Sequence, residues 1–144
     1  MIFLRPYENK DFAVVYEQEN TLFHPMKESE FMSMYVEDEL VHILMIDDGN
    51  QAIGYLIIWL DMDKSQIYSM VIFEPFQRQG NGYVALMLLE IYLKQKGVHE
   101  WSLEVRKSNH KALGLYQKMG FKTEATREGY YRDHEDALLM LKII

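Results

Sequence analysis

The sequence predicts an α+β fold, with a mixed, mostly antiparallel central sheet of about seven strands flanked by about four helices. Three β-rich runs follow one another in the middle of the chain with only short turns between them, which is typical of an antiparallel meander. The third run is joined to a fourth by a long apolar helix, and such a crossover implies a parallel pair of strands. Two further β-rich runs close the chain as an antiparallel pair.

The first half of the chain predicts one strand, two helices and the meander. Residues 10–22 are predicted to be helical because Phe12, Val15 and Tyr16 lie one helical turn apart. The stretch "FHP" interrupts the chain, and residues 27–36 form a second short helix. The predicted strands are rich in β-branched and aromatic residues, and "DDGN" and "DMDK" form the turns of the meander. These strands are residues 2–5, 41–46, 52–60 and 66–73.

The second half predicts two helices that alternate with strands. A long helix follows the glycine-rich stretch "QRQGNG" and ends at Lys96, with Gly97 as its C-cap. The next helix, "SNHKALGLYQKMG", is capped by Ser108 or Asn109 and ends at Gly120. Its residues Ala112, Leu115, Tyr116 and Met119 follow the spacing of one buried face. The remaining strands of this half are residues 100–106, 121–127 and 136–143.

Length and composition favour a single domain over residues 1–144, since 49% of them are hydrophobic and 26% are charged. Cysteine is absent, which excludes disulfides, thiolate metal sites and a cysteine nucleophile and fits a reducing cytoplasm. The N-terminal residues lack the pattern of a signal peptide, and the longest apolar run, "YVALMLL", is too short to cross a membrane. We therefore expect a cytoplasmic protein without a membrane partner.

The charge of the chain and the placement of its histidines disfavour two further classes of function. The net charge is −7, from 15 basic and 22 acidic residues, which disfavours direct binding to nucleic acid. The five histidines are scattered, and no pair of them has metal-ligand spacing together with a third ligand. The sequence therefore predicts no metal site.

The stretch "QRQGNG" at residues 77–82 predicts an anion site. Glycines at the start of a helix let a ligand approach the backbone, where free amides and the helix dipole favour a phosphate group. Gly80, Gly82 and Ala85 also satisfy the dinucleotide-binding fingerprint, with Glu100 twenty residues after Gly80. That alternative is disfavoured, because "EPFQRQ" separates the glycines from their strand, a meander precedes that strand, and too few elements follow.

The same stretch resembles the pyrophosphate loop of the GNAT superfamily of acyl-CoA-dependent N-acetyltransferases. Gln77, Gly80 and Gly82 match the pattern Gln/Arg-x-x-Gly-x-Gly/Ala of that loop, and the order of predicted elements is the order of the GNAT fold. The resemblance covers nearly the whole chain. The segments "LEVRKSNHKALGLYQKMGF" and "TREGYYRDHEDALLM" are most similar to RimI-type ribosomal-protein-alanine N-acetyltransferases.

The resemblance implies that acetyl-CoA lies between two splayed strands, and it implies no metal. Backbone groups of three residues in one strand would bind the pantetheine arm and the acetyl carbonyl, and Asn109 would also bond the arm. Tyr83 is bulkier than the residue common at its position, so its direction decides whether it hinders the nucleotide. The three strand residues are Met70, Val71 and Ile72, and the loop amides are those of Arg78, Gln79, Gly80, Asn81, Gly82 and Tyr83.

Glu104 and Tyr116 are the predicted catalytic residues. Glu104 alternates with the apolar residues of its strand, and a carboxylate there is costly unless it is paired or functional. The alternative to a general base is an ion pair with Arg106 on the same face. In the RimI-type enzymes that the chain resembles, the position of Glu104 is that of a base acting through water. A tyrosine at Tyr116 can bury its ring and still present its hydroxyl as the acid for the departing thiolate.

The resemblance implies acetyl transfer from acetyl-CoA to a primary amine, by direct attack in a ternary complex. The predicted acceptor is the N-terminal α-amino group of a protein. One alternative is a small amine such as a polyamine or amino sugar, and another is a non-catalytic acyl-CoA-binding module, which the presence of Glu104, Tyr116 and Asn109 disfavours. Tyr130 and Tyr131 border the acceptor site in the family. "RDHEDA" at residues 132–137 is interpreted as a solvated turn, whose acids, with Glu124 and Glu128, could also line a groove for a basic peptide. The sequence leaves a monomer and a homodimer open.

Overall fold

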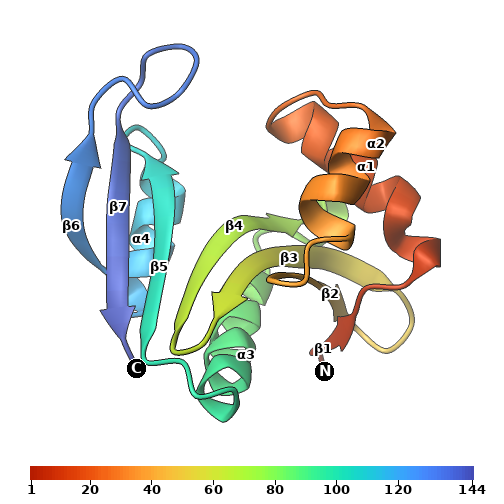
Figure 1. Cartoon of the computed structure of the whole chain (residues 1–144). Coiled ribbons are helices and arrows are strands. Elements are labelled where there is room, and N and C mark those ends of the chain that lie inside the picture. Colours follow the sequence, from red (N-terminus) through yellow and green to blue (C-terminus); the bar gives the residue numbers. More distant parts are fainter.

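A seven-stranded sheet runs through the molecule in the order β1-β2-β3-β4-β5-β7-β6 (Figure 1). The structure is a computed structural model that describes residues 1–144. Every pair of neighbouring strands is antiparallel except β4 and β5, which are parallel, so the predicted mixed sheet is confirmed. The strands are β1 (Phe3–Pro6), β2 (Val41–Asp47), β3 (Ala52–Asp61), β4 (Lys64–Ile72), β5 (Glu100–Arg106), β6 (Lys122–Arg127) and β7 (Ala137–Ile143).

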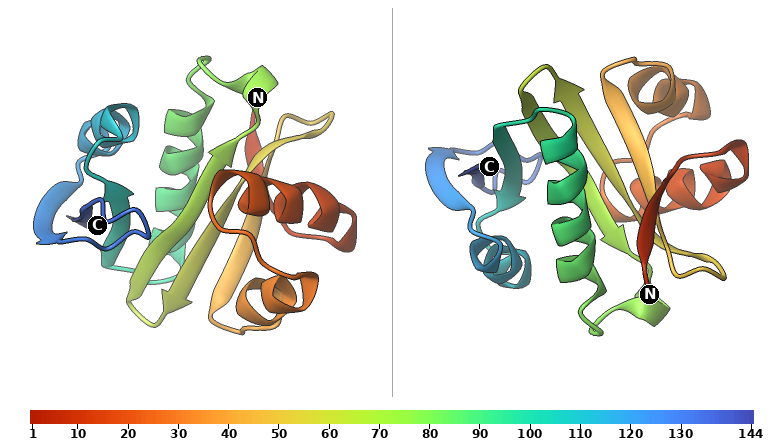
Figure 2. Two further views of the ribbon diagram at one scale, coloured as in Figure 1. Left: turned by 90° about the horizontal axis from the view of Figure 1, so that it is seen from above. Right: turned by 90° about the horizontal axis from the view of Figure 1, so that it is seen from below.

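Helices cover both faces of the sheet (Figure 2). On one face, α3 and α4 pack over a core of 18 buried residues that includes Leu86, Trp101 and Leu103. On the other face, α1 and α2 pack over a second core of 8 buried residues, centred on Phe31 and Tyr55. The helices are α1 (Phe12–Leu22), α2 (Glu28–Phe31), α3 (Asn81–Gln95) and α4 (His110–Lys118). None of them is long and apolar enough to cross a lipid bilayer.

The predicted elements all form, with small differences at their ends. The helix expected from residue 10 starts as a 3₁₀ turn, Asn9–Asp11, and the helix expected over 27–36 is α2 followed by a π turn, Met32–Val36. The third strand of the meander begins at Lys64 instead of residue 66, because a tight turn with Met62 at a φ of 56° brings Lys64 opposite Asp61.

Strands β4 and β5 are paired only where they begin. Their parallel ladder runs from Lys64 opposite Glu100 to Ile67 opposite Leu103, and it ends there. At the same level, the register of β4 with β3 shifts, which leaves Tyr68 as a bulge. Figure 1 shows the two strands diverging beyond this level. The second half of β4 is therefore unpaired on its β5 side.

Candidate active site

A groove of about 510 Å³ lies on the face of the sheet that carries α3 and α4. It extends from Met70 and Ile72 of β4, past the glycine-rich turn, to the first turns of α4. Three cations, Arg78, Lys111 and Lys118, line it, and no acidic residue does. A cationic groove on a chain of net charge −7 is a local feature suited to an anionic ligand.

The glycine-rich turn presents free amides to this groove. Gly80 caps α3 in the left-handed region, at a φ of 81°, and no atom lies within 4 Å of where a Cβ would stand. The amide of Val84 donates the first bond of this turn, to the Gly80 carbonyl. The preceding amides have no partner within the helix, so they can bind an anion at its positive end. The Gln77 amide nitrogen fixes the turn by donating to the carbonyl of Ile72 at 2.8 Å.

Tyr83 and Asn109 lie on opposite sides of the groove, and both line it. The Tyr83 ring is half-buried and packs against the core. The Lys118 ammonium lies over this ring, 4.3 Å from its centre, in a cation–π contact. The ring therefore forms part of the wall and holds a cation there. Asn109 caps α4, and its side-chain oxygen accepts the amide of Ala112 at 3.2 Å.

Glu104 lies on the opposite face of the sheet, away from the core that α3 and α4 cover. Its side chain is 14% exposed. Gln66 of β4 donates to its Oε1 at 3.3 Å, and the Nε of Arg127 lies 3.3 Å from its Oε2. That Arg127 contact is within ion-pair distance but outside hydrogen-bond geometry, so Oε2 is buried without a hydrogen-bond partner.

The ion pair between Glu104 and Arg106, which was the alternative to a general base, does not form. Arg106 donates to Asp133 at 2.9 and 3.0 Å and to Glu135 at 3.0 Å, and its guanidinium lies 4.1 Å from the centre of the Tyr131 ring. The reason is the folding of the β6–β7 connection over the end of β5, which offers Arg106 two carboxylates. The acids of "RDHEDA" thus fix this connection in place, and two of them already have a cationic partner.

Tyr116 is 8% exposed on α4, with its ring 5.9 Å from that of Phe121. Burial, and then the neighbouring Tyr131, raises the pKa of Tyr116 to about 12. Burial, and then the Glu104 carboxylate, raises the pKa of Tyr131 as well. A phenol with so high a pKa stays protonated at neutral pH and acts as a hydrogen-bond donor.

Comparison with known proteins decides the family. A model of the Acetyltransferase (GNAT) family matches residues 4–121. The chain belongs to the GNAT acetyltransferase family. It is 36% identical over 133 residues to a candidate [ribosomal protein bS18]-alanine N-acetyltransferase of Bacillus subtilis (strain 168), covering 91% of this chain and 88% of that one. It is 34% identical over 119 residues to the [ribosomal protein bS18]-alanine N-acetyltransferase of Salmonella typhimurium, covering 81% and 79%.

Solved structures agree with this assignment. The crystal structure of the ribosomal-protein-S18-alanine N-acetyltransferase from Escherichia coli superposes with a TM-score of 0.87 at 28% identity, over 100% of this chain and 94% of that one. A spermidine N-acetyltransferase from Vibrio cholerae, solved with CoA and spermine, has the same TM-score at 17% identity, which shows the shared fold alone. The protein is therefore a GNAT N-acetyltransferase, as the resemblance predicted.

Three neighbours of Glu104 in this GNAT fold were not predicted from the sequence. Gln66 and Arg127 contact its carboxylate. Tyr130 is the third neighbour: burial raises the pKa of its phenol, and the nearby Glu104 carboxylate raises it further. Gln66 could have been placed from the parallel pairing, because it lies opposite Ser102 on the same face as Glu104. Arg127 had no such signal, since β7 lies between its strand and β5.

A second carboxylate is buried on the α1 side of the sheet. Glu19 of α1 is 2% exposed and accepts hydrogen bonds from the Tyr55 hydroxyl at 2.6 Å and from the Ser69 hydroxyl at 3.1 Å. Burial raises the pKa of Glu19, and the two hydrogen bonds oppose that rise only in part. Because Ser69 directly precedes Met70, this cluster ties α1 to the stretch of β4 that lines the groove.

Proposed function

We propose that residues 1–144 form one GNAT domain that transfers an acetyl group from acetyl-CoA to the N-terminal α-amino group of a protein. The observation that carries the proposal is the opening between β4 and β5, with a cationic groove on one face and the Glu104 carboxylate on the other. Two substrates can reach this opening from opposite faces at once, which suits direct attack in a ternary complex. The acceptor follows the names of the relatives, which act on the alanine terminus of ribosomal protein bS18.

The groove fits the acetyl donor. Its open glycine at residue 80 and the free amides of Asn81, Gly82 and Tyr83 suit a pyrophosphate, together with the amides of Arg78 and Gln79. The cationic side chains of the groove would stabilise the charge of the nucleotide. The parted backbone of Met70, Val71 and Ile72, with Asn109 opposite, would hold the pantetheine arm. Acetyl-CoA would then supply an activated thioester at the opening.

The residues on the two faces suit the two proton transfers. An α-amino group has a pKa of about 7.7–8.0, against about 10.4 for lysine, so a modest base suffices to neutralise it near pH 7. We assign that proton to Glu104, directly or through water. The thiolate that leaves as the new amide bond forms needs a proton or a strong hydrogen bond, and we assign this to the Tyr116 hydroxyl.

The test is an acceptor panel. The protein is given acetyl-CoA with peptides that begin with Ala, Ser or Met, with an N-terminally blocked peptide that contains lysine, and with spermidine, and the released thiol is measured. We expect turnover to depend on the first residues of the peptide and the blocked peptide to be inert. A preference for spermidine or for the blocked lysine peptide would contradict the proposal and favour a different amine acceptor.

A further inference from the structure

The Oε2 atom of Glu104 is the least satisfied polar atom of the candidate site. It is buried and accepts no hydrogen bond, although Gln66 satisfies the other oxygen of the same carboxylate. A buried carboxylate oxygen without a donor is costly, and in a site it marks a place where a ligand donor fits. Two groups lie near this carboxylate: Arg127, whose Nε is 3.3 Å from Oε2 but not directed at it, and Tyr130, whose phenol pKa is raised by burial and then by the Glu104 carboxylate.

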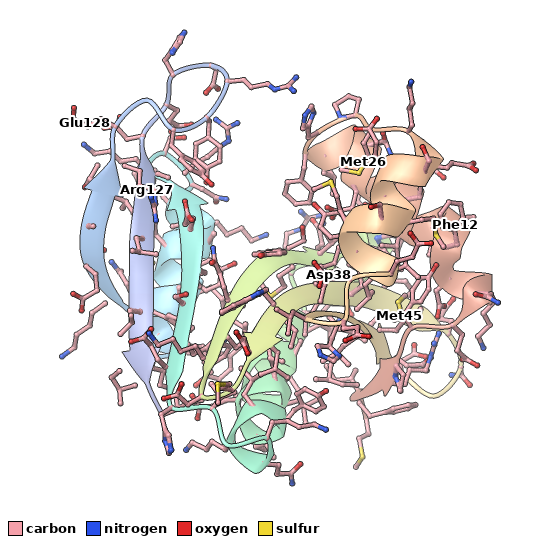
Figure 3. All side chains as sticks on the ribbon, viewed as in Figure 1. Phe12, Met26, Asp38, Met45, Arg127 and Glu128 are labelled. Atoms are coloured by element: carbon pink, nitrogen blue, oxygen red, sulfur yellow. The ribbon has the colours of Figure 1, made fainter.

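Arg127 is held loosely in this position. Its side chain is 51% exposed, and Glu104 is the only carboxylate with which the structure pairs it. Its guanidinium also lies 5.9 Å from the centre of the Tyr130 ring, at the outer limit of a cation–π contact. Arg127 is the last residue of β6, directly before the β6–β7 connection, and Figure 3 shows it on the half of the molecule opposite Met26 and Asp38. Little besides Glu104 keeps this side chain in place.

We propose that Arg127 is a stand-in cation, which occupies the place of the acceptor's ammonium group beside Glu104 and yields it when the acceptor binds. The inference rests on the proposed function, because it assumes that the acceptor amine reaches Glu104. In the free enzyme the guanidinium compensates a carboxylate that would otherwise be buried without a cation. The acceptor's ammonium is smaller, and it can direct an N–H at Oε2, which Arg127 does not.

The exchange has a consequence for proton transfer. Once the guanidinium has moved into water, the ammonium is the sole cation at Oε2 and has the carboxylate as its proton acceptor. The proton passes from the ammonium nitrogen to Glu104, directly or through water, and leaves a neutral amine at the opening between β4 and β5. Arg127 thus sets the acceptor affinity by competition and takes no part in the transfer itself.

The prediction is that Arg127→Gln binds acceptor more tightly. The acceptor no longer displaces a cation, so the KM for an Ala-starting peptide should fall about two- to fivefold, the range of a partly exposed ion pair, while kcat stays within about twofold. Arg127→Lys should restore the wild-type KM. Lys122→Gln is the matched control, because it removes the same charge from the other end of β6, about 17 Å along the strand, and should leave KM unchanged.

A binding measurement separates competition at Glu104 from a general change in charge. The N-acetylated product peptide has no ammonium, so its Kd for the CoA-loaded protein should be equal in wild type and Arg127→Gln, whereas the Kd of the free-amine peptide should fall. An unchanged or raised KM in Arg127→Gln, or equal tightening of both peptides, would overturn the proposal. If wild type acetylates no N-terminus at all, it is the proposed function that fails, and the same comparison with spermidine then tests Arg127.

Discussion

Replacing Gly54 by alanine should damage both stability and donor binding, because the backbone of β4 leaves no room for a Cβ at this residue of β3. A Cβ added there would stand 2.2 Å from the carbonyl oxygen of Val71, and 3.1 Å from the Cα of Ile72. Both are backbone atoms, so no side-chain rotation can relieve the overlap. Gly54 is paired with Ile72, at the end of the stretch of β4 that lines the groove.

The size of the effect follows from the distance. Ordinary contact begins at about 3.4 Å, so the Val71 carbonyl must retreat by about 1 Å. Overpacking of this kind costs about 1–3 kcal/mol, which lowers the melting temperature by about 3–10 °C for a chain of this length. The same displacement moves Met70 and Ile72 relative to the parted strand β5. A misplacement of 1 Å near the chemistry can lower the rate by about 10²-fold.

The assay is thermal unfolding of Gly54→Ala with and without CoA, followed by turnover at saturating acceptor. Gly114→Ala is the matched control, because this helical glycine has open space and an ordinary φ, and should stabilise α4 by up to about 1 kcal/mol. We expect a lower melting temperature and a smaller CoA-induced shift for Gly54→Ala alone. A Gly54→Ala protein as stable as wild type, with the same shift, would refute the argument that contact with β3 positions β4.

Two further substitutions test the buried residues Tyr116 and Glu19. Tyr116→Phe keeps the ring packing but deletes the donor, so turnover should fall about 10²–10⁴-fold with little change in melting temperature, and unchanged turnover would leave Tyr116 a core residue. Because the folded-state pKa of Glu19 is raised above its ordinary value of 4.5, the stability linked to its protonation is lost as pH rises through the folded pKa. Glu19→Gln has no carboxyl group to titrate at this position and does not lose this stability. The melting temperature of Glu19→Gln minus that of wild type should therefore increase from pH 4 to pH 8, and a difference that stays constant would contradict this prediction.

Local patterns in the sequence predicted the elements well, because each depends on neighbours in the chain. Gly97 adopts a φ of 84° directly after Lys96, the C-cap of α3, and the Asn109 side chain caps α4. The strand at 100–106 forms with the predicted boundaries, and its burial alternates residue by residue. The separation of β4 and β5 was predicted only from the family resemblance, because the residue pattern within either strand does not indicate where their pairing ends.

The partners of Glu104 were harder to predict because they come from distant parts of the chain. In the sequence, Arg106 is the nearest cation on the same face of the strand as Glu104, and an ion pair with it was the alternative to a catalytic role. In the structure Arg106 pairs with Asp133 and Glu135. Glu104 pairs with Arg127, which lies on β6, a strand that does not border β5. Which arginine meets which carboxylate depends on the path of the β6–β7 connection, and alternation within one strand cannot determine it.

Under the proposed function, the sheet separates the charges that would receive an anionic donor and a cationic acceptor. The cations of the groove lie on the α3 and α4 face, with no acidic residue among its lining, whereas the carboxylate of Glu104 points to the other face. The donor would then meet cations along its approach, and the acceptor would meet the Glu104 carboxylate after displacing Arg127. Asp133 and Glu135 are already paired with Arg106, so we expect a preference for basic residues later in the acceptor to come mainly from the overall charge of −7, which salt screens. Recognition of the terminal amine beside Glu104 would be at short range and less sensitive to salt.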